Sequence, residues 1–324
     1  MIPAEVLMVV GFVMASYSIV GNDAIQTLGT LLSSNAHRPW WLLWLFAGAV
    51  MVAVLTYGWL VHGDVSYGRL QTIPFPDRFT WIYCAPPLVL LLLTRGGIPV
   101  STTFLTLTLF APKALSSMLI KSLLGYATAF VIAILVYRFV TRHLESRFSR
   151  TPGPVSAWWI VAQWCSTGFL WSQWLIQDLA NIFVFLPRQL SPAWFLMAVG
   201  VMLLLHAVIF ATRGGAIQKV VLTKSNTTDI RSATFVDLIY GVVLLLFKEV
   251  SNIPMSTTWV FVGLLAGREI AIAWNQRHRS RREVSRLVLS DFAKIVTGLA
   301  VSVGLALALP AGEDRRLTDR RAGA

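Results

Sequence analysis

The sequence Ile98-Pro99-Val100-Ser101-Thr102-Thr103 returns, with one change, as Ile253-Pro254-Met255-Ser256-Thr257-Thr258. A second pair of polar stretches shares its spacing: Gly21-Asn22-Asp23-Ala24-Ile25-Gln26 in the first half and Gln177-Asp178-Leu179-Ala180-Asn181 in the second. Ser256 follows Ser101 by 155 residues (256 − 101), and Asp178 follows Asp23 by 155 residues (178 − 23). Two matches at one offset, close to half of the 324 residues, predict an internal duplication.

The composition indicates an integral membrane protein. Hydrophobic residues make up 56% of the chain and charged residues only 13%, whereas soluble domains carry roughly 25% charged residues. So few polar side chains cannot cover a globule that faces water. The net charge of +12 fits Lys and Arg retained in cytoplasmic loops and not a nucleic-acid partner. We expect a multi-pass protein of the inner or plasma membrane, with the lipid bilayer as its surroundings.

The apolar residues fall into about ten segments, five in each half. A helix needs about 20 apolar residues to cross the roughly 30 Å of hydrocarbon. The first segment continues past Gly21 to Leu32 and is interrupted by Asn22 and Asp23, and the fourth is short and ends at Pro112. We therefore predict an all-α polytopic protein with broken or re-entrant helices. The segments are Ile2–Val20, Trp40–Val61, Phe79–Thr94, Ile98–Pro112, Leu119–Val140, Trp158–Leu175, Pro192–Thr212, Ala233–Phe247, Ile253–Trp274 and Leu287–Leu309.

The odd number of segments per half predicts that the two halves have opposite orientations in the membrane. The split falls at Thr151-Pro152-Gly153-Pro154, so residues 1–150 form the first repeat and residues 151–324 the inverted second repeat. Basic clusters follow Val140 and Thr212 and occupy residues 277–286, and the positive-inside rule puts all three in the cytoplasm and both termini outside. Inverted repeats with broken helices are the plan of secondary transporters.

The repeated motifs carry chemistry suited to a transport site. Polar side chains within apolar segments mark function by default. Carboxylate and amide oxygens are hard ligands for a small cation such as Na⁺, and a carboxylate can also carry a proton. Pro-x-Ser-Thr-Thr suits a helix start, where free N–H groups and hydroxyls receive a tetrahedral oxyanion. Two such starts facing each other would enclose one anion.

These motifs resemble those of the inorganic phosphate transporter (PiT) family. The stretch GNDAIQTLGT is similar to the signature GANDVANSFGT, QDLAN is similar to its second copy, and IPVSTT and IPMSTT resemble the PxSTTH motifs. The resemblance implies phosphate uptake coupled to Na⁺ or H⁺, with no cofactor or metal other than a transported Na⁺. It implies that the coupling ion is bound by Asn22, Asp23, Gln177 and Asp178. It also implies that phosphate is bound by Ser101, Thr102, Thr103, Ser256, Thr257, Thr258, Gln26 and Asn181.

The chain departs from the family pattern in several places. Gln26 and Gln177 replace Asn, and Phe104 and Trp259 replace the His after each STT. Family members carry an acid one helix before each PxSTT; Asp237 fits this place in the second half, whereas the region around Ile82 has none. Sulfate or another tetrahedral oxyanion therefore stays open as the substrate.

Functions of other classes stay open as alternatives. They are an intramembrane enzyme acting on lipid phosphates and a passive anion channel. We expect no enzyme, because the sequence has no Ser/His/Asp spacing, HExxH or phosphate-binding glycine loop. A homodimer also stays open.

Overall fold

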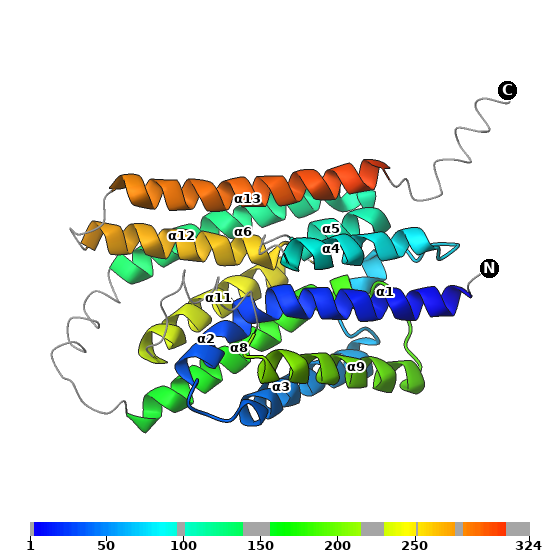
Figure 1. The fold of residues 1–324 in the computed structure, drawn as a ribbon, viewed down its shortest axis with the longest axis horizontal. Helices are drawn as coiled ribbons and strands as arrows, with labels where there is room; N and C mark the ends of the chain where they lie inside the picture. The colour runs from blue at the N-terminus through cyan, green and yellow to red at the C-terminus, as the bar shows by residue number, and fades with distance from the viewer. Residues whose placement is uncertain are drawn as a thin grey trace.

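The computed structural model describes residues 3–95, 101–138, 156–214, 230–250, 252–275 and 281–308. These residues form helices joined by turns and loops, without a strand among them (Figure 1). The fold is all-α, as predicted. Its α-helices are α1 (Ala4–Ile19), α2 (Ile25–Ser34), α3 (Trp40–His62), α4 (Ala85–Arg95), α5 (Thr102–Phe110), α6 (Leu115–Val136), α8 (Ala157–Phe183), α9 (Pro192–Ala211), α11 (Ile230–Val250), α12 (Thr257–Asn275) and α13 (Arg281–Ala308). Shorter turns are η1 (Val20–Ala24), η2 (Leu70–Thr72), η3 (Trp81–Cys84) and η4 (Pro112–Ala114).

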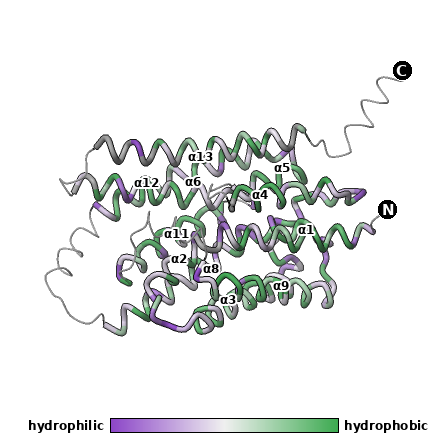
Figure 2. The backbone as a smooth tube through the Cα atoms, viewed as in Figure 1, coloured by the Kyte–Doolittle hydropathy of each residue, from purple (hydrophilic) through white to green (hydrophobic). Residues whose placement is uncertain are grey.

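The helices coincide with the predicted apolar segments, and the protein is a multi-pass membrane protein. Within the described residues, five helical segments are long and apolar enough to cross a bilayer: Ala4–Asp23, Trp40–His62, Pro112–Val136, Pro192–Ala211 and Ile230–Val250. Large apolar side chains on them face outward, with Leu60, Leu196 and Leu204 about two-thirds exposed (68%, 68% and 70%). Figure 2 shows hydrophobic residues along most of the length of α3 and α9. Such a surface is stable against lipid and not against water.

The first apolar stretch departs from regular α-helix where the break is predicted, but the helical path is continuous. Between α1 and α2 the backbone widens into the π-helix η1, which contains Asn22 and Asp23. Single π turns inside α-helices often occur at functional sites. The corresponding region of the second half differs, because α8 is continuous through Asp178. Ile176 stands there at the position equivalent to Gly21, so this stretch lacks the glycine that favours a departure from regular helix.

The fourth predicted segment is too short to cross the membrane. Helices α4 and α5 contain 11 and 9 residues, which at 1.5 Å per residue correspond to roughly 17 and 14 Å. A chain that enters along α4 and returns along α5 therefore reaches only about half of the hydrocarbon thickness. Helices α11 and α12, which carry the second PxSTT motif between them, are longer.

The two halves of the chain are packed into each other. Helix α6 of the first half packs on α12 of the second, α5 packs on α13, and α3 packs on α8 and α9. In Figure 1, α13, α12 and α6 run side by side on one flank, and α3 and α9 run on the other. The first turn of α1 and the last turn of α13 lie at the same end of the helices (Figure 1).

Several predicted features lie outside the described residues. These are residues 98–100 of the first PxSTT motif, the split at residues 151–154, most residues of the three basic clusters, and the tail after residue 308.

Two glycines bring α12 against the backbone of α6. A Cβ atom added to Gly263 would lie 2.4 Å from the carbonyl oxygen of Tyr126, and one added to Gly267 would lie 2.3 Å from that of Phe130. Any side chain at these positions would have to push the helices apart. Small residues that allow close backbone approach are the common device for packing helices in membranes.

We predict that Gly263→Ala lowers the stability of the protein by about 1–3 kcal/mol, the usual effect of overpacking a tight contact. The measurement is the thermal unfolding midpoint of the purified protein in detergent. Gly200→Ala on α9 is the matched control, because no atom lies within 4 Å of a Cβ added there. Equal midpoints for the two variants would contradict the proposed tight contact.

Candidate functional site

The two STT motifs form helix starts, each capped by its serine. The Ser101 Oγ accepts a hydrogen bond from the backbone N–H of Phe104 at 3.3 Å, and the Ser256 Oγ accepts one from that of Trp259 at 3.3 Å. The capping role predicted for these hydroxyls is present in both copies. The threonines after each serine lie in the first turn, where the backbone N–H groups have no partner within the helix.

The Asp23 carboxylate lies between both helix starts and is fully buried. Its Oδ1 accepts hydrogen bonds from Asn22 Nδ2 at 2.8 Å, Gln26 Nε2 at 3.1 Å and Thr258 Oγ1 at 3.3 Å. Its Oδ2 accepts one from Thr102 Oγ1 at 2.7 Å. The carboxylate therefore links the segment α1–η1–α2 to the first hairpin, formed by α4 and α5, and to the second, formed by α11 and α12.

Asn181 performs a similar linking role for the second half. Its Nδ2 donates to Asp178 Oδ1 at 2.6 Å, to Thr103 Oγ1 at 3.1 Å and to Thr102 Oγ1 at 3.4 Å. The Thr103 hydroxyl in turn donates to the carbonyl oxygen of Met255 at 3.0 Å, which joins the tips of the two hairpins. Residues 78 to 235 positions apart in the sequence thus meet in one polar cluster.

Four buried oxygen atoms of this cluster lack a hydrogen-bond donor among the described residues. They are the amide oxygens Gln26 Oε1 and Asn181 Oδ1, the carboxylate oxygen Asp178 Oδ2 and the hydroxyl oxygen Thr257 Oγ1. Buried acceptors without a donor are rare in folded proteins and call for a binding explanation. Neutral and anionic oxygens are the ligands that a hard monovalent cation prefers.

Gln177 does not join the carboxylates, although its position repeats that of Asn22. Its Nε2 donates to the carbonyl oxygen of Leu244 on α11 at 3.0 Å. The other predicted site residues lie in the cluster or in the two helix starts that enclose it.

Lys121 and Ser122 are site-supporting residues that the sequence analysis did not identify. The Lys121 Nζ donates to the carbonyl oxygen of Ile253 at 2.6 Å, and the Ser122 Oγ accepts from the backbone N–H of Ser256 at 2.8 Å. Both come from α6 and hold the start of the second hairpin. A lysine inside the predicted segment Leu119–Val140 was the available signal, because charges inside apolar spans are rarely incidental.

Arg69 was also missed, and no sequence pattern singles it out. It comes from the α3–α4 loop (residues 63–80) and has no exposed surface. Its Nη1 donates to the carbonyl oxygen of Ile176 at 3.1 Å. Burial lowers the pKa of Arg69 to about 10, and Asp178 is the foremost of the carboxylates whose charges act to raise it. The guanidinium is therefore still charged at neutral pH.

A second buried carboxylate cluster surrounds Asp237. Its Oδ1 accepts from Thr30 Oγ1 at 2.7 Å, and its Oδ2 accepts from Thr167 Oγ1. The positions 155 residues away from these three are Ile82, Phe185 and Phe12, all apolar. This polar cluster is therefore present in one half of the molecule and replaced by apolar side chains in the other.

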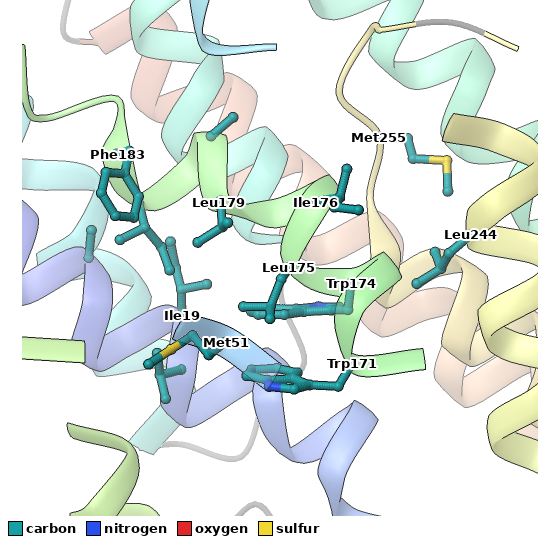
Figure 3. Close-up of a cluster of buried hydrophobic side chains, with 14 of the residues drawn as sticks. Ile19, Met51, Trp171, Trp174, Leu175, Ile176, Leu179, Phe183, Leu244 and Met255 are labelled. Atoms are coloured by element: carbon teal, nitrogen blue, oxygen red, sulfur yellow. The ribbon is translucent and has the colours of Figure 1, made fainter. Parts of the chain in front are cut away.

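A buried apolar cluster lies next to the site, on the α8 residues that precede Gln177 and Asp178. The rings of Trp171 and Trp174 are stacked with centroids 4.9 Å apart, and both side chains are buried. Figure 3 shows them beside Leu175 and Ile19, with Met255 on the far side of the same cluster. A surrounding of low dielectric constant strengthens every interaction between charges in the site.

Comparisons with known proteins identify the fold. No protein-family model matches the sequence, and a search of curated proteins finds no match. Among solved structures, the chain is similar to one described as "The sodium-dependent phosphate transporter". The TM-score is 0.59 at 17% identity, over 95% of this chain and 99% of that one. The fold is that of this transporter.

We predict that Thr102→Val destabilises the protein by about 1.5–3 kcal/mol, because it removes a hydrogen bond to a buried charged group. Thr106→Val, one helical turn later, is the matched control, since the buried Thr106 Oγ1 has no hydrogen-bond partner in the described structure. The thermal unfolding midpoint in detergent checks both. If Thr106→Val lowers the unfolding midpoint as much as Thr102→Val, the Asp23–Thr102 hydrogen bond is not the cause of the lost stability.

Proposed function

We propose that this protein is a secondary active transporter that carries inorganic phosphate together with a coupling cation, Na⁺ or H⁺, by alternating access. The observation that carries the proposal is the position of Asp23, which is buried and bonded to both STT helix starts. Carboxylates at two helix N-termini make a combined site for an anion and a cation. The likeness of the fold to a sodium-dependent phosphate transporter supports this choice of substrate and favours Na⁺.

The anion would bind at the two helix starts. First-turn N–H groups and the positive end of the helix dipole attract oxyanions. Hydroxyl groups of the STT motifs, with the amides of Gln26 and Asn181, would complete the set: Ser101, Thr102, Thr103, Ser256, Thr257 and Thr258. In the described conformation several of these hydroxyls donate to carboxylate or carbonyl oxygens, so binding of phosphate requires them to exchange partners.

The cation would bind at the carboxylates, where it would offset their charge as the anion enters. The proposed ligands are Asn22, Asp23 and Asp178. Gln177, the fourth residue predicted to bind the ion, points to Leu244 in the described conformation and would have to turn to take part. Unpartnered oxygens next to Asp23 and Asp178 support this assignment. Two buried carboxylates beside a phosphate would otherwise repel it strongly, so the cation and the anion favour each other's binding.

We further propose that residues 1–150 and 151–324 are inverted repeats. Support comes from residues that are 155 positions apart in the sequence and lie in the same site. They are Asp23 and Asp178, and Thr102 and Thr257. Helices of the two halves also pack directly on each other, as α6 does on α12 and α5 on α13. Repeats of this kind let a site open alternately to either side by motion of one part against the other. We propose the plasma membrane as the location.

The direct test is uptake of radiolabelled phosphate into proteoliposomes with an imposed Na⁺ gradient or proton gradient. We expect phosphate to accumulate under a Na⁺ gradient. Accumulation under a proton gradient alone would assign H⁺ as the coupling ion. Accumulation of sulfate in place of phosphate would contradict the substrate assignment, and conductance without either gradient would indicate a channel.

We predict that Asp23→Asn and Asp178→Asn each reduce gradient-driven uptake to the background of empty liposomes, because each removes a carboxylate that neutralises the coupling ion. Asp77→Asn is the control, since Asp77 is exposed in the α3–α4 loop. Full uptake by the double variant Asp23→Asn/Asp178→Asn would exclude the proposed coupling mechanism.

A further inference from the structure

Arg69 is a buried charge beside the site, bonded to the backbone of α8 at Ile176. The α3–α4 loop that carries it folds inward, held by the Asp64 carboxylate. Asp64 Oδ1 accepts from the backbone N–H and the hydroxyl of Ser66, both at 2.8 Å, and its Oδ2 accepts from the N–H of Leu70 at 3.0 Å. These bonds fix the loop on both sides of Arg69 and occupy both oxygens of its nearest acid in sequence.

The guanidinium of Arg69 is only partly satisfied. Its Nη1 donates to the carbonyl oxygens of Ile176 at 3.1 Å and Ser66 at 3.4 Å. Its Nε and Nη2 have no hydrogen-bond partner among the described residues. These two groups form the edge that binds a carboxylate or oxyanion with two parallel hydrogen bonds. A buried guanidinium requires a compensating charge, because burial of an isolated ion is strongly unfavourable.

The Asp178 carboxylate is the leading source of that compensating charge. The Arg69 guanidinium makes no direct ion pair with a described acid, but its Nη1 is bonded to the carbonyl oxygen of Ile176, two residues before Asp178. The charge of Asp178 acts on it from there, together with those of Asp64 and Glu249. The Asp178 Oδ2 is buried and has no donor at ordinary hydrogen-bond distance, although the Thr103 and Thr257 hydroxyls lie beside this carboxylate. Other charged or titratable groups around the pair are Asp23, Tyr240 and Lys121, from η1, α11 and α6. Among the described residues, the guanidinium of Arg69 therefore supplies a positive charge near Asp178.

The α3–α4 loop also touches the tip of the second hairpin. Lys248 Nζ lies 5.9 Å from the ring centroid of Tyr67, and a Cβ added to Gly68 would lie 3.9 Å from Asn252 Nδ2. The position of Arg69 is thus set by contacts on α8 and on the hairpin. A movement of either element changes the distance between the guanidinium and Asp178.

We propose that Arg69 is an internal competitor of the coupling cation at Asp178 and thereby sets the Na⁺ affinity of the transporter. The inference rests on the proposed cation site. A Na⁺ ion that binds at Asp178 is repelled by the charge of the nearby guanidinium. A protein without this arginine binds Na⁺ more tightly and releases it less readily. Asp23 has no such competitor, because its four partners are amides and hydroxyls.

The test is Na⁺ binding to the purified protein without phosphate, measured as the rise in thermal unfolding midpoint when Na⁺ replaces choline at constant ionic strength and pH. We expect Arg69→Gln to lower the half-saturating Na⁺ concentration by roughly tenfold, the order expected when a neighbouring unit charge inside a protein is removed. The gain should vanish in Arg69→Gln/Asp178→Asn. Arg188→Gln controls for a disturbance of the loop itself, because Arg188 donates to the Ile73 and Pro74 carbonyls of the same α3–α4 loop but touches neither acid of the site.

Several outcomes would overturn the proposal. They are unchanged or weaker Na⁺ binding in Arg69→Gln, a gain that persists in the double variant, and an equal gain in Arg188→Gln. If Arg69→Gln does not fold, Arg69→Lys replaces it. Lysine keeps the charge but lacks the planar edge, so we expect an intermediate Na⁺ affinity. A wild-type Na⁺ affinity in Arg69→Lys would contradict the role of the guanidinium. Wild-type protein that Na⁺ does not stabilise would refute this inference, whereas phosphate uptake under a proton gradient would leave the proposed phosphate transport standing.

Discussion

Burial of carboxylates in a hydrocarbon-facing fold is the constraint on which the rest of the site depends. An ionised group far from water is tolerated only when donors or opposite charges surround it. Asp23 satisfies this condition with partners from its own broken helix and from two hairpins that are distant in sequence. The same bonds that stabilise the charge therefore also fix the positions of the helix starts. A ligand that changes the charge of Asp23 changes the attachment of both hairpins at once.

The second carboxylate satisfies the same constraint by different means. Asp178 has one amide donor, the hydroxyls of Thr103 and Thr257 beside it, and a nearby arginine, whereas Asp23 has four neutral donors and no arginine among its partners. The Asp237 cluster adds a further difference, since its counterparts in the other half are apolar. A duplicated sequence has thus diverged into two unlike electrostatic environments around one site. The two halves need not respond equally to the same ion.

Local features of this structure were predictable from the sequence, and features set by tertiary contacts were not. Ser101 and Ser256 cap helices because proline and hydroxyl residues define a helix start over a few positions. The break at Asn22 and Asp23 follows a glycine in an otherwise apolar run. The direction of Gln177 could not be predicted from the repeat. The π turn in the first copy changes the angular phase of the helix, and α8 has no such turn, so equivalent positions face different neighbours. Arg69 reaches the site only because a loop folds inward, and no local pattern encodes that path.

The contact of Gly263 and Gly267 with the backbone of α6 has a consequence for biosynthesis. Helix α6 is made before residue 150, but the helix that fits it this closely begins at Thr257. Until then, its face toward α12 has only lipid or the insertion machinery as a neighbour, and Asp23 lacks the hydroxyl of Thr258. The first half therefore cannot reach its final packing when it leaves the ribosome. Assembly of this protein has to be completed after the whole chain is in the membrane, so its folding differs from the domain-by-domain folding during synthesis that is common in large soluble proteins.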